Sequence, residues 1–203
     1  SGRELPWLTQ IVVEMSHFVR DFWWIIIGGI VATVFGVLNF YKSPEGKKKM
    51  DTWFIALPIF GPLIQKGAIA RFSRTLSTLL SSGVGIIEAL DISAKVSGNS
   101  TIENSLYLAK DSISEGKSIT TPLVQNKYMP DMVIQMIGVG EQTGAMDVML
   151  EKVADFYEDE VDYAVGALTS VMEPLLMVVL GGIIAFLVIA MYLPIFDLAS
   201  GFG

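Results

Sequence analysis

The stretch FWWIIIGGIVATVFGVLNF, from Phe22 to Phe40, decides the fold class of this chain. It is 19 residues long and uncharged. A helix of that length spans roughly 28 Å, close to the ~30 Å hydrocarbon core of a bilayer. Trp23 and Trp24 at one end, and Tyr41 at the other, are placed where aromatic belts lie. We therefore expect a transmembrane helix here, in preference to the buried core helix that such a run can also form.

A second uncharged run, from Leu175 to Phe196, is also long enough to cross a membrane. The basic residues near the spans then predict the orientation. Lys42 and the run 47–49 follow the first span, only Arg3 and Arg20 precede it, and no Lys or Arg follows the second span. The segment between the spans is thus expected in the cytoplasm, with both ends of the chain outside it and with Lys47, Lys48 and Lys49 at the cytoplasmic leaflet.

The expected organisation has six parts. They are an extracytoplasmic amphipathic segment (1–21), a transmembrane helix (22–40), a cytoplasmic linker (41–64), a cytoplasmic helical bundle domain (65–173), a transmembrane helix (174–196) and an extracytoplasmic tail (197–203). The chain begins Ser1-Gly2 without an initiator Met and shows no signal peptide. We expect it to be either a processed product or, in preference, an excised piece of a longer protein.

The bundle is predicted from apolar residues at helical spacing, separated by glycines. These residues are Ile69, Phe72, Leu76, Leu79 and Leu80; Ile86, Ile87, Leu90 and Ala94; Ile102, Leu106, Ala109 and Ile113; Val133, Met136 and Ile137; and Leu150, Val153, Phe156 and Tyr157. The breaks fall at Gly83, Gly98, Gly116 and Gly144. No stretch alternates like a strand. The expected fold is an all-α membrane protein, with an up-and-down antiparallel helical bundle between two transmembrane helices.

Three local signals refine this bundle. Ser100 to Glu103 reads as a capping box, and Thr121-Pro122 as the cap and first residue of a short helix. From about Ala145 the helical pattern has no strong breaker before Pro174. One long helix is therefore expected to continue into the second span, with a kink at Pro174.

The sequence offers little for catalysis. It has no cysteine and one histidine, His17, so it supports neither a Ser-His-Asp site nor a histidine-rich metal site. Gly138, Gly140 and Gly144 lack the spacing of a nucleotide-binding loop. Neither span has an ionisable residue, which argues against a transporter or a membrane enzyme. A net charge of −7 without a basic stripe argues against nucleic acid. We predict no enzyme activity, no cofactor and no metal.

Acidic residues recur at helical spacing before the second span: Glu151, Asp155, Glu158 and Asp162. Asp162 precedes Pro174 by about 18 Å of helix and Asp155 by about 28 Å. At that depth, Lys47 to Lys49 near the membrane are not expected to neutralise all of the stripe, so an unneutralised acidic face is expected. It is a candidate partner-binding surface; a hard cation and a merely solvated helix face are the alternatives.

Small residues on the two spans, and a short glycine-containing segment before the second span, complete the candidates. Gly28, Ala32 and Gly36 on the first span, and Gly181 and Ala185 on the second, are spaced for close helix packing, either within the chain or against other chains. Gly140, Glu141 and Gly144 form a polar turn. There we expect a positive φ at Gly144 and a capping or bridging role for Glu141, ahead of partner contact.

Several short motifs occur in a specific order along the chain. They are Leu5-Pro6 with Thr9, Leu80-Ser81-Ser82-Gly83-Val84, Ile86-Ile87-Glu88-Ala89-Leu90, Gly140-Glu141-Gln142-Thr143-Gly144, Glu173-Pro174 and Tyr192-Leu193-Pro194-Ile195-Phe196. In this the chain resembles the inner-membrane platform proteins of type IV pilus and type II secretion machines, the PilC/GspF family. Gly85 departs from the family, which often has Pro there, and this loosens the start of the following helix.

The resemblance implies the second half of such a protein: its second cytoplasmic domain between two spans of the bacterial inner membrane. It implies a scaffold that couples a hexameric assembly ATPase to the insertion or extraction of pilin or pseudopilin subunits. Further implied partners are other inner-membrane assembly proteins, the lipid bilayer and copies of the chain itself. A subunit of a transporter or channel is the alternative, and a membrane-anchored enzyme is a third possibility.

Overall fold

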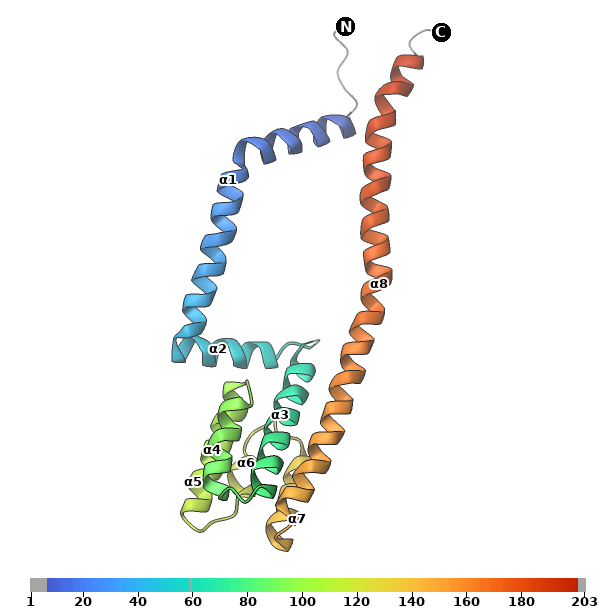
Figure 1. The fold of residues 1–203 in the computed structure, drawn as a ribbon. Helices are drawn as coiled ribbons and strands as arrows, with labels where there is room; N and C mark the ends of the chain where they lie inside the picture. Colours follow the sequence, from blue (N-terminus) through green and yellow to red (C-terminus); the bar gives the residue numbers. More distant parts are fainter. Residues whose placement is uncertain (1–6, 59, 201–203) are drawn as a thin grey trace. The chain divides into compact units, whose positions relative to one another are not determined.

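The computed structural model describes residues 7–58 and 60–200, and every regular element in them is a helix (Figure 1). The elements are α1 (Trp7–Lys42), α2 (Pro44–Ile55), α3 (Gly61–Ser81), α4 (Ile86–Val96), α5 (Ser100–Ser114), α6 (Thr120–Leu123), α7 (Asp131–Thr143) and α8 (Met146–Ser200). The all-α fold class is confirmed. Leu5, Pro6 and residues 201–203 of the expected tail lie outside the described residues.

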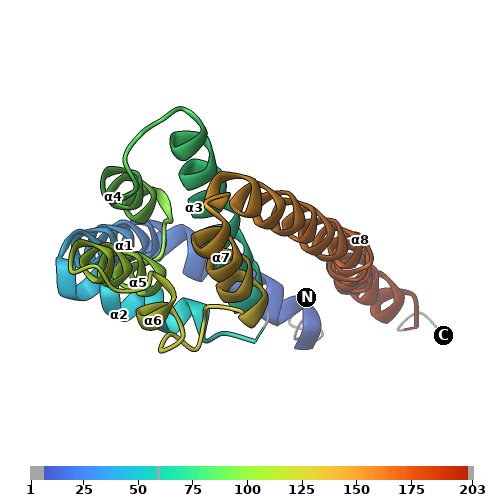
Figure 2. The ribbon, with the colours of Figure 1, turned by 90° about the horizontal axis from the view of Figure 1, so that it is seen from below.

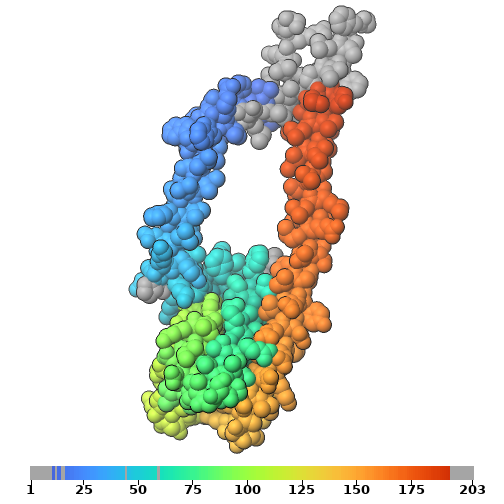
Figure 3. All heavy atoms as spheres, in the orientation of Figure 1, coloured from blue at the N-terminus to red at the C-terminus, as the bar shows by residue number. Residues whose placement is uncertain are grey.

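The chain divides into two units: residues 40–167 form one, and residues 1–39 with 168–203 form the other. The first, here called the bundle unit, holds α2 to α7, the last turn of α1 and the first part of α8. In Figure 2, α3 lies between α4 and this part of α8. Figure 3 shows the side chains of α3 and α4 in contact on one face.

One apolar core holds the bundle unit together. Six helices or their flanking turns contribute fully buried side chains to it: Ile69, Phe72, Leu76, Leu90, Ile102, Leu106, Ile119, Leu123, Val133, Ile137, Leu150 and Val153. Most of the predicted apolar faces therefore point inward. Ile87 and Phe156 do not: each is 47% exposed, so their assignment to the core was wrong. Their helical spacing is right, but each lies at the edge of its apolar stripe.

Two predicted helix starts also need correction. Asn99, not Ser100, caps α5, because its side-chain oxygen accepts from the N–H groups of Thr101 and Ile102. Glu103 pairs with Lys47 instead of completing a capping box. In α6 the helix begins at Thr120 after Ile119, which forms no side-chain cap, so Thr121 is not the cap.

The region expected as a linker, 41–64, contains α2 and the start of α3. Ser43 caps α2 by accepting from the Gly46 N–H at 3.0 Å, and Pro44 takes the first helical position. Further on, Gly85 precedes α4 with φ −60°, close to the φ that proline fixes. The backbone of this chain thus has the conformation that a proline would need there.

The other unit contains the apolar parts of α1 and α8. Both helices are long and apolar enough to cross a membrane, over His17–Lys42 and within Met146–Tyr192. Their apolar side chains lie open, as at Phe35 (70% exposed) and Val178 (73% exposed). Pro174 lies inside the continuous helix α8. Helices this apolar and this exposed are suited to a lipid environment.

Candidate functional site

The predicted acidic stripe lies on the first part of α8, and its middle is bound by Arg74 of α3. The Arg74 Nε donates to Glu158 Oε1 at 2.8 Å, and Nη2 donates to Glu158 Oε2 at 2.7 Å and to Asp155. Such a fork matches the two oxygens of a carboxylate. The hydrogen bonds to Glu158, and to a smaller extent the one to Asp155, raise the pKa of Arg74 above its ordinary value, so the guanidinium stays charged.

The expectation of an unneutralised stripe is therefore wrong for its middle. Its four carboxylates stand against one guanidinium, which leaves a net charge of −3 on these five side chains. Glu151 and Asp162 are exposed, and neither has an ion-pair partner among the described residues. The candidate partner-binding face is thus acidic at its two ends, and Arg74 neutralises one of the two carboxylates between them.

A hollow of about 530 Å³ opens beside Arg74. Its walls come from α3, α4 and α8 and include Arg71, Arg74, Val96, Val161 and Asp162. Val96 is 44% exposed there. Apolar and charged groups of both signs thus meet in one concave surface.

The Arg74 fork should contribute modestly to stability. Glu158→Lys removes the pair and places a second cation beside Arg74. Because the Arg74 and Glu158 side chains are 37% and 47% exposed, we expect a loss of about 1 kcal/mol and a fall in Tm of about 2–4 °C. Thermal unfolding of the detergent-solubilised chain measures this.

The matched control is Asp159→Lys, which makes the same charge change at an exposed mid-helix position of α8. The swap of Arg74→Glu with Glu158→Arg should recover most of the loss. If Glu158→Lys unfolds at the wild-type temperature, or the swap recovers nothing, the fork does not hold α3 to α8.

The end of α7 holds three of the predicted residues. Gly140 and Glu141 lie in the last turn of this helix, so the expectation that they form part of a polar turn was wrong, and only Gly144 lies beyond it. Gly144 ends α7 in the left-handed conformation with φ 72°, as expected. Gly140 is buried, and a Cβ built there would lie 2.8 Å from the Cα of Met146. The absence of a side chain at Gly140 therefore lets the end of α7 pack directly on the first residue of α8.

The Glu141 side chain binds the loop that precedes α6. Its Oε1 accepts from the Ile119 N–H at 2.9 Å, and its Oε2 accepts from the Ser118 hydroxyl at 2.6 Å. The carboxylate thereby ties α7 to the loop that precedes α6. This is the bridging role that the sequence favoured over partner contact, although the bridged residues lie more than twenty positions earlier in the chain.

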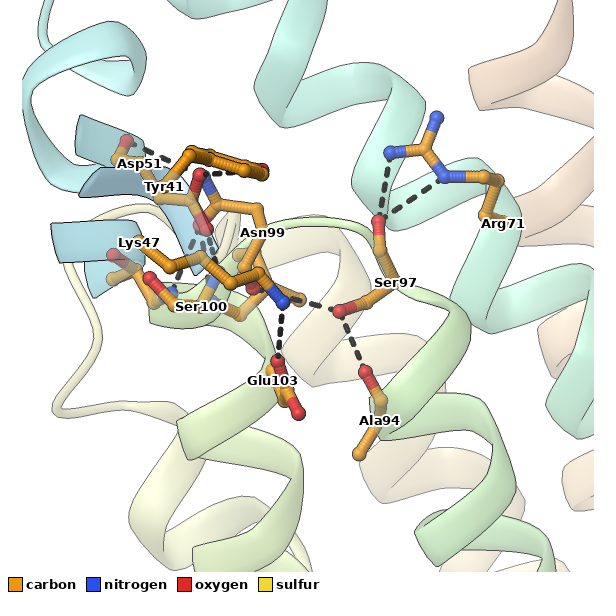
Figure 4. Close-up of polar contacts among 11 residues, drawn as sticks. Tyr41, Lys47, Asp51, Arg71, Ala94, Ser97, Asn99, Ser100 and Glu103 are labelled. Atoms are coloured by element: carbon orange, nitrogen blue, oxygen red, sulfur yellow. Dashed lines mark hydrogen bonds and ion pairs between the residues drawn. The ribbon is translucent and has the colours of Figure 1, made fainter. Parts of the chain in front are cut away.

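A polar junction that the sequence did not indicate joins the end of α1 to the bundle (Figure 4). Asp51 of α2 is buried, with 5% of its surface exposed. Its Oδ2 accepts from the Ser100 N–H at 2.9 Å, and its Oδ1 accepts from the Tyr41 hydroxyl at 3.3 Å. Asn99 Nδ2 donates to the Asp51 carbonyl at 3.4 Å. One side chain thus links the last turn of α1, α2 and the start of α5.

Arg71 completes the other side of this junction. Its guanidinium donates to the Ser97 carbonyl from Nε at 3.1 Å and from Nη2 at 2.7 Å (Figure 4). A cation at the C-terminal end of α4 is favourable for the helix dipole. The loop between α4 and α5 is therefore held from both sides, by Arg71 of α3 and Asp51 of α2.

The other predicted residues are not brought together. A Cβ added at Gly28, Gly36 or Gly181 would meet no described atom within 4 Å apart from the nearby backbone of its own helix, and close packing at these glycines stays a prediction. His17 lies exposed on α1, and its Nδ1 is 3.2 Å from Nη2 of Arg20. Among the described residues, no group of three His, Asp, Glu or Cys could hold a metal ion.

Residues 72–194, more than half of the chain, match the family described as type II secretion system (T2SS), protein F. The chain belongs to this family. The matched region starts in α3 and runs through every later helix into α8. The resemblance carried by the ordered motifs is thereby confirmed.

Relatives in the family bear two kinds of name. The chain is 51% identical over 199 residues to the type IV pilus assembly protein PilC of Myxococcus xanthus, an alignment that covers 98% of this chain and 48% of the relative. Against PilC of Pseudomonas aeruginosa it is 41% identical over 203 residues, covering 100% of this chain and 54% of the relative. Against the type II secretion system protein F of Xanthomonas campestris it is 31% identical, covering 98% and 49%.

The chain spans about half the length of the curated relatives it matches. The chain is a member of the protein F family with two helices apolar enough to cross a membrane, which supports an inner-membrane protein of the pilus and secretion assembly class.

Proposed function

We propose that this chain is part of a platform in the inner membrane that supports the assembly of a type IV pilus or a type II secretion pseudopilus. The family match across the bundle and α8 carries this proposal. The two exposed apolar helices support it, because a platform of this kind must be anchored in the bilayer. In this role the chain is a scaffold and needs no catalytic residue and no cofactor.

In the orientation that the lysines favour, the bundle unit faces the cytoplasm. There it would meet a hexameric assembly ATPase and pass its motion to pilin or pseudopilin subunits in the membrane. The continuous helix α8 supports this idea, because one element extends from the bundle core at Leu150 into the apolar stretch. A movement applied to the bundle would thus reach the membrane through a single helix. Other inner-membrane assembly proteins and copies of the chain are further proposed partners.

We place the ATPase contact at the ends of the acidic stripe. Glu151 and Asp162 are exposed and carry two of the three negative charges that Arg74 leaves uncompensated. A basic surface on the ATPase would complement this charge, which sets association rate and register more than final affinity. The hollow between Arg74 and Asp162 offers a place for a side chain from the same partner.

Binding of the purified full-length protein to the assembly ATPase of the same organism tests this contact. The variant Glu151→Lys with Asp162→Lys should weaken binding about tenfold at low salt, and less at high salt, where the charges are screened. The control, Glu88→Lys with Asp111→Lys, makes the same change in net charge on α4 and α5. Equal binding by both variants at low salt would show that the stripe is only a solvated face.

A further inference from the structure

Helix α2 has an exposed face of its own, opposite the side that holds Asp51 and Ile55 in the bundle. Six residues of this face and the turn that follows line a hollow of about 680 Å³: Glu45, Lys48, Lys49, Thr52, Trp53 and Ala56. Trp53 is 63% exposed, so a large aromatic ring lies uncovered beside two lysines. Two ammonium groups there stand against one carboxylate.

Lys47 belongs to a different side of the helix. Its Nζ lies 3.6 Å from Glu103 of α5, so this lysine helps to dock α2 on the bundle. The three consecutive lysines therefore differ: Lys47 pairs with the bundle, Lys49 faces outward, and Lys48 lies at the edge of the exposed face, where it also lines a hollow shared with α5. No described residue forms an ion pair with Lys48 or Lys49.

The chain itself keeps α2 next to the end of the first apolar helix. Only Ser43 separates α1, which ends at Lys42, from α2. Tyr41 and Asp51 are ten positions apart, about 15 Å along a continuous helix, yet a hydrogen bond of 3.3 Å joins them. The turn also requires glycine at position 46, because a Cβ there would collide with the Phe40 carbonyl. Helix α2 thus turns sharply away from the direction of the last turn of α1.

We propose that this face of α2 binds the anionic phospholipid headgroups of the leaflet at which α1 ends. Lys48 and Lys49 contact the phosphates, and Trp53 lies at the level of the headgroups, where tryptophan is enriched in membrane proteins. Charge complementarity and the one-residue link to a bilayer-spanning helix specify this occupant. The proposal is independent of the assembly role and of which leaflet faces the cytoplasm.

A spin label on the exposed face tests the proposal in the whole chain. The protein has no cysteine, so Ala56→Cys, at the exposed end of this face, gives a single labelling site. The labelled chain is placed in nanodiscs of phosphatidylcholine alone or with phosphatidylglycerol. With the anionic lipid, the label should become less accessible to a water-soluble nickel chelate and more accessible to oxygen.

Each lysine near an anionic surface contributes roughly fivefold to the binding constant, so Lys48→Gln with Lys49→Gln should shift the balance between bound and free states by roughly 25-fold. The control, Lys127→Gln with Lys152→Gln, removes the same charge from exposed positions elsewhere and should change nothing. A label that is equally accessible in both lipid mixtures overturns the proposal. So does a response to anionic lipid that persists without Lys48 and Lys49.

Discussion

Gly140→Val is expected to lower the unfolding temperature of the chain by roughly 5–10 °C. A Cβ at this position would lie 2.8 Å from the Cα and 3.1 Å from the Sδ of Met146. The first of these atoms is backbone, so a side chain can be accommodated only if α8 moves away from α7. Overpacking of this kind typically costs about 1–3 kcal/mol, and a β-branched residue in a helix adds to the cost.

The neighbouring glycine supplies the control. A Cβ at Gly138 would be 3.5 Å from Thr120 Cγ2, an ordinary contact distance. Gly138→Ala should therefore leave stability unchanged or raise it by up to about 1 kcal/mol through helix propensity. Gly144→Ala is an intermediate case, since its φ of 72° strains an L-residue although the space around it is open. Thermal unfolding that leaves Gly140→Val as stable as wild type would show that the α7–α8 contact is not close.

Asp51→Ala should destabilise the chain by about 2–3 kcal/mol and release α2 from the bundle. The substitution removes the acceptor of the Ser100 N–H, and an unpaired buried donor costs about 1–3 kcal/mol. It also removes a carboxylate from the positive end of the α5 dipole. Hydrogen exchange should therefore accelerate in α2 and in the first turn of α5, and Tm should fall.

Two milder variants separate the contributions. Asp51→Asn keeps an acceptor oxygen for Ser100 but loses the charge, so its effect should be smaller than that of alanine. Tyr41→Phe removes only the 3.3 Å bond to Asp51 and should have the smallest effect. If Asp51→Ala leaves the exchange of α2 at the wild-type rate, this side chain does not dock the helix.

The sequence predicted the helices whose signals are local. Apolar spacing located α3, α4, α5 and α7, and the glycine breaks fell where the backbone has positive φ, at Gly83, Gly98, Gly116 and Gly144. The long apolar runs located the two spans. In each case the deciding information lies within one or two helical turns of the residue concerned.

The sequence did not predict helix α2, because the face that this helix turns toward the bundle lacks apolar residues at helical spacing. Its buried residues include Gly46 and Asp51, which carry no apolar signal. The Ser43-Pro44 pair was a usable sign of a helix start, since Ser is a good cap and Pro suits the first helical position. At α5, the residue before the predicted cap is itself a good cap, because the Asn99 side-chain oxygen accepts from two N–H groups.

The electrostatics of the stripe depend on partners far away in sequence. Arg74 lies more than eighty positions before Asp155 and Glu158, and Ser118 lies 23 positions before Glu141. Nothing local to either carboxylate indicates its partner. Only the packing of α3 beside α8, and of α7 beside the α6 loop, brings these groups together.

The most direct test of the platform role is the phenotype of a strain without the gene for the full-length protein. Surface pili are counted by electron microscopy, secreted proteins are measured in the medium, and the intact gene is returned in a complemented strain. We expect loss of pili or of secretion, with recovery on complementation. Normal piliation and normal secretion together with the loss of a solute flux would contradict the platform role and favour a transporter subunit.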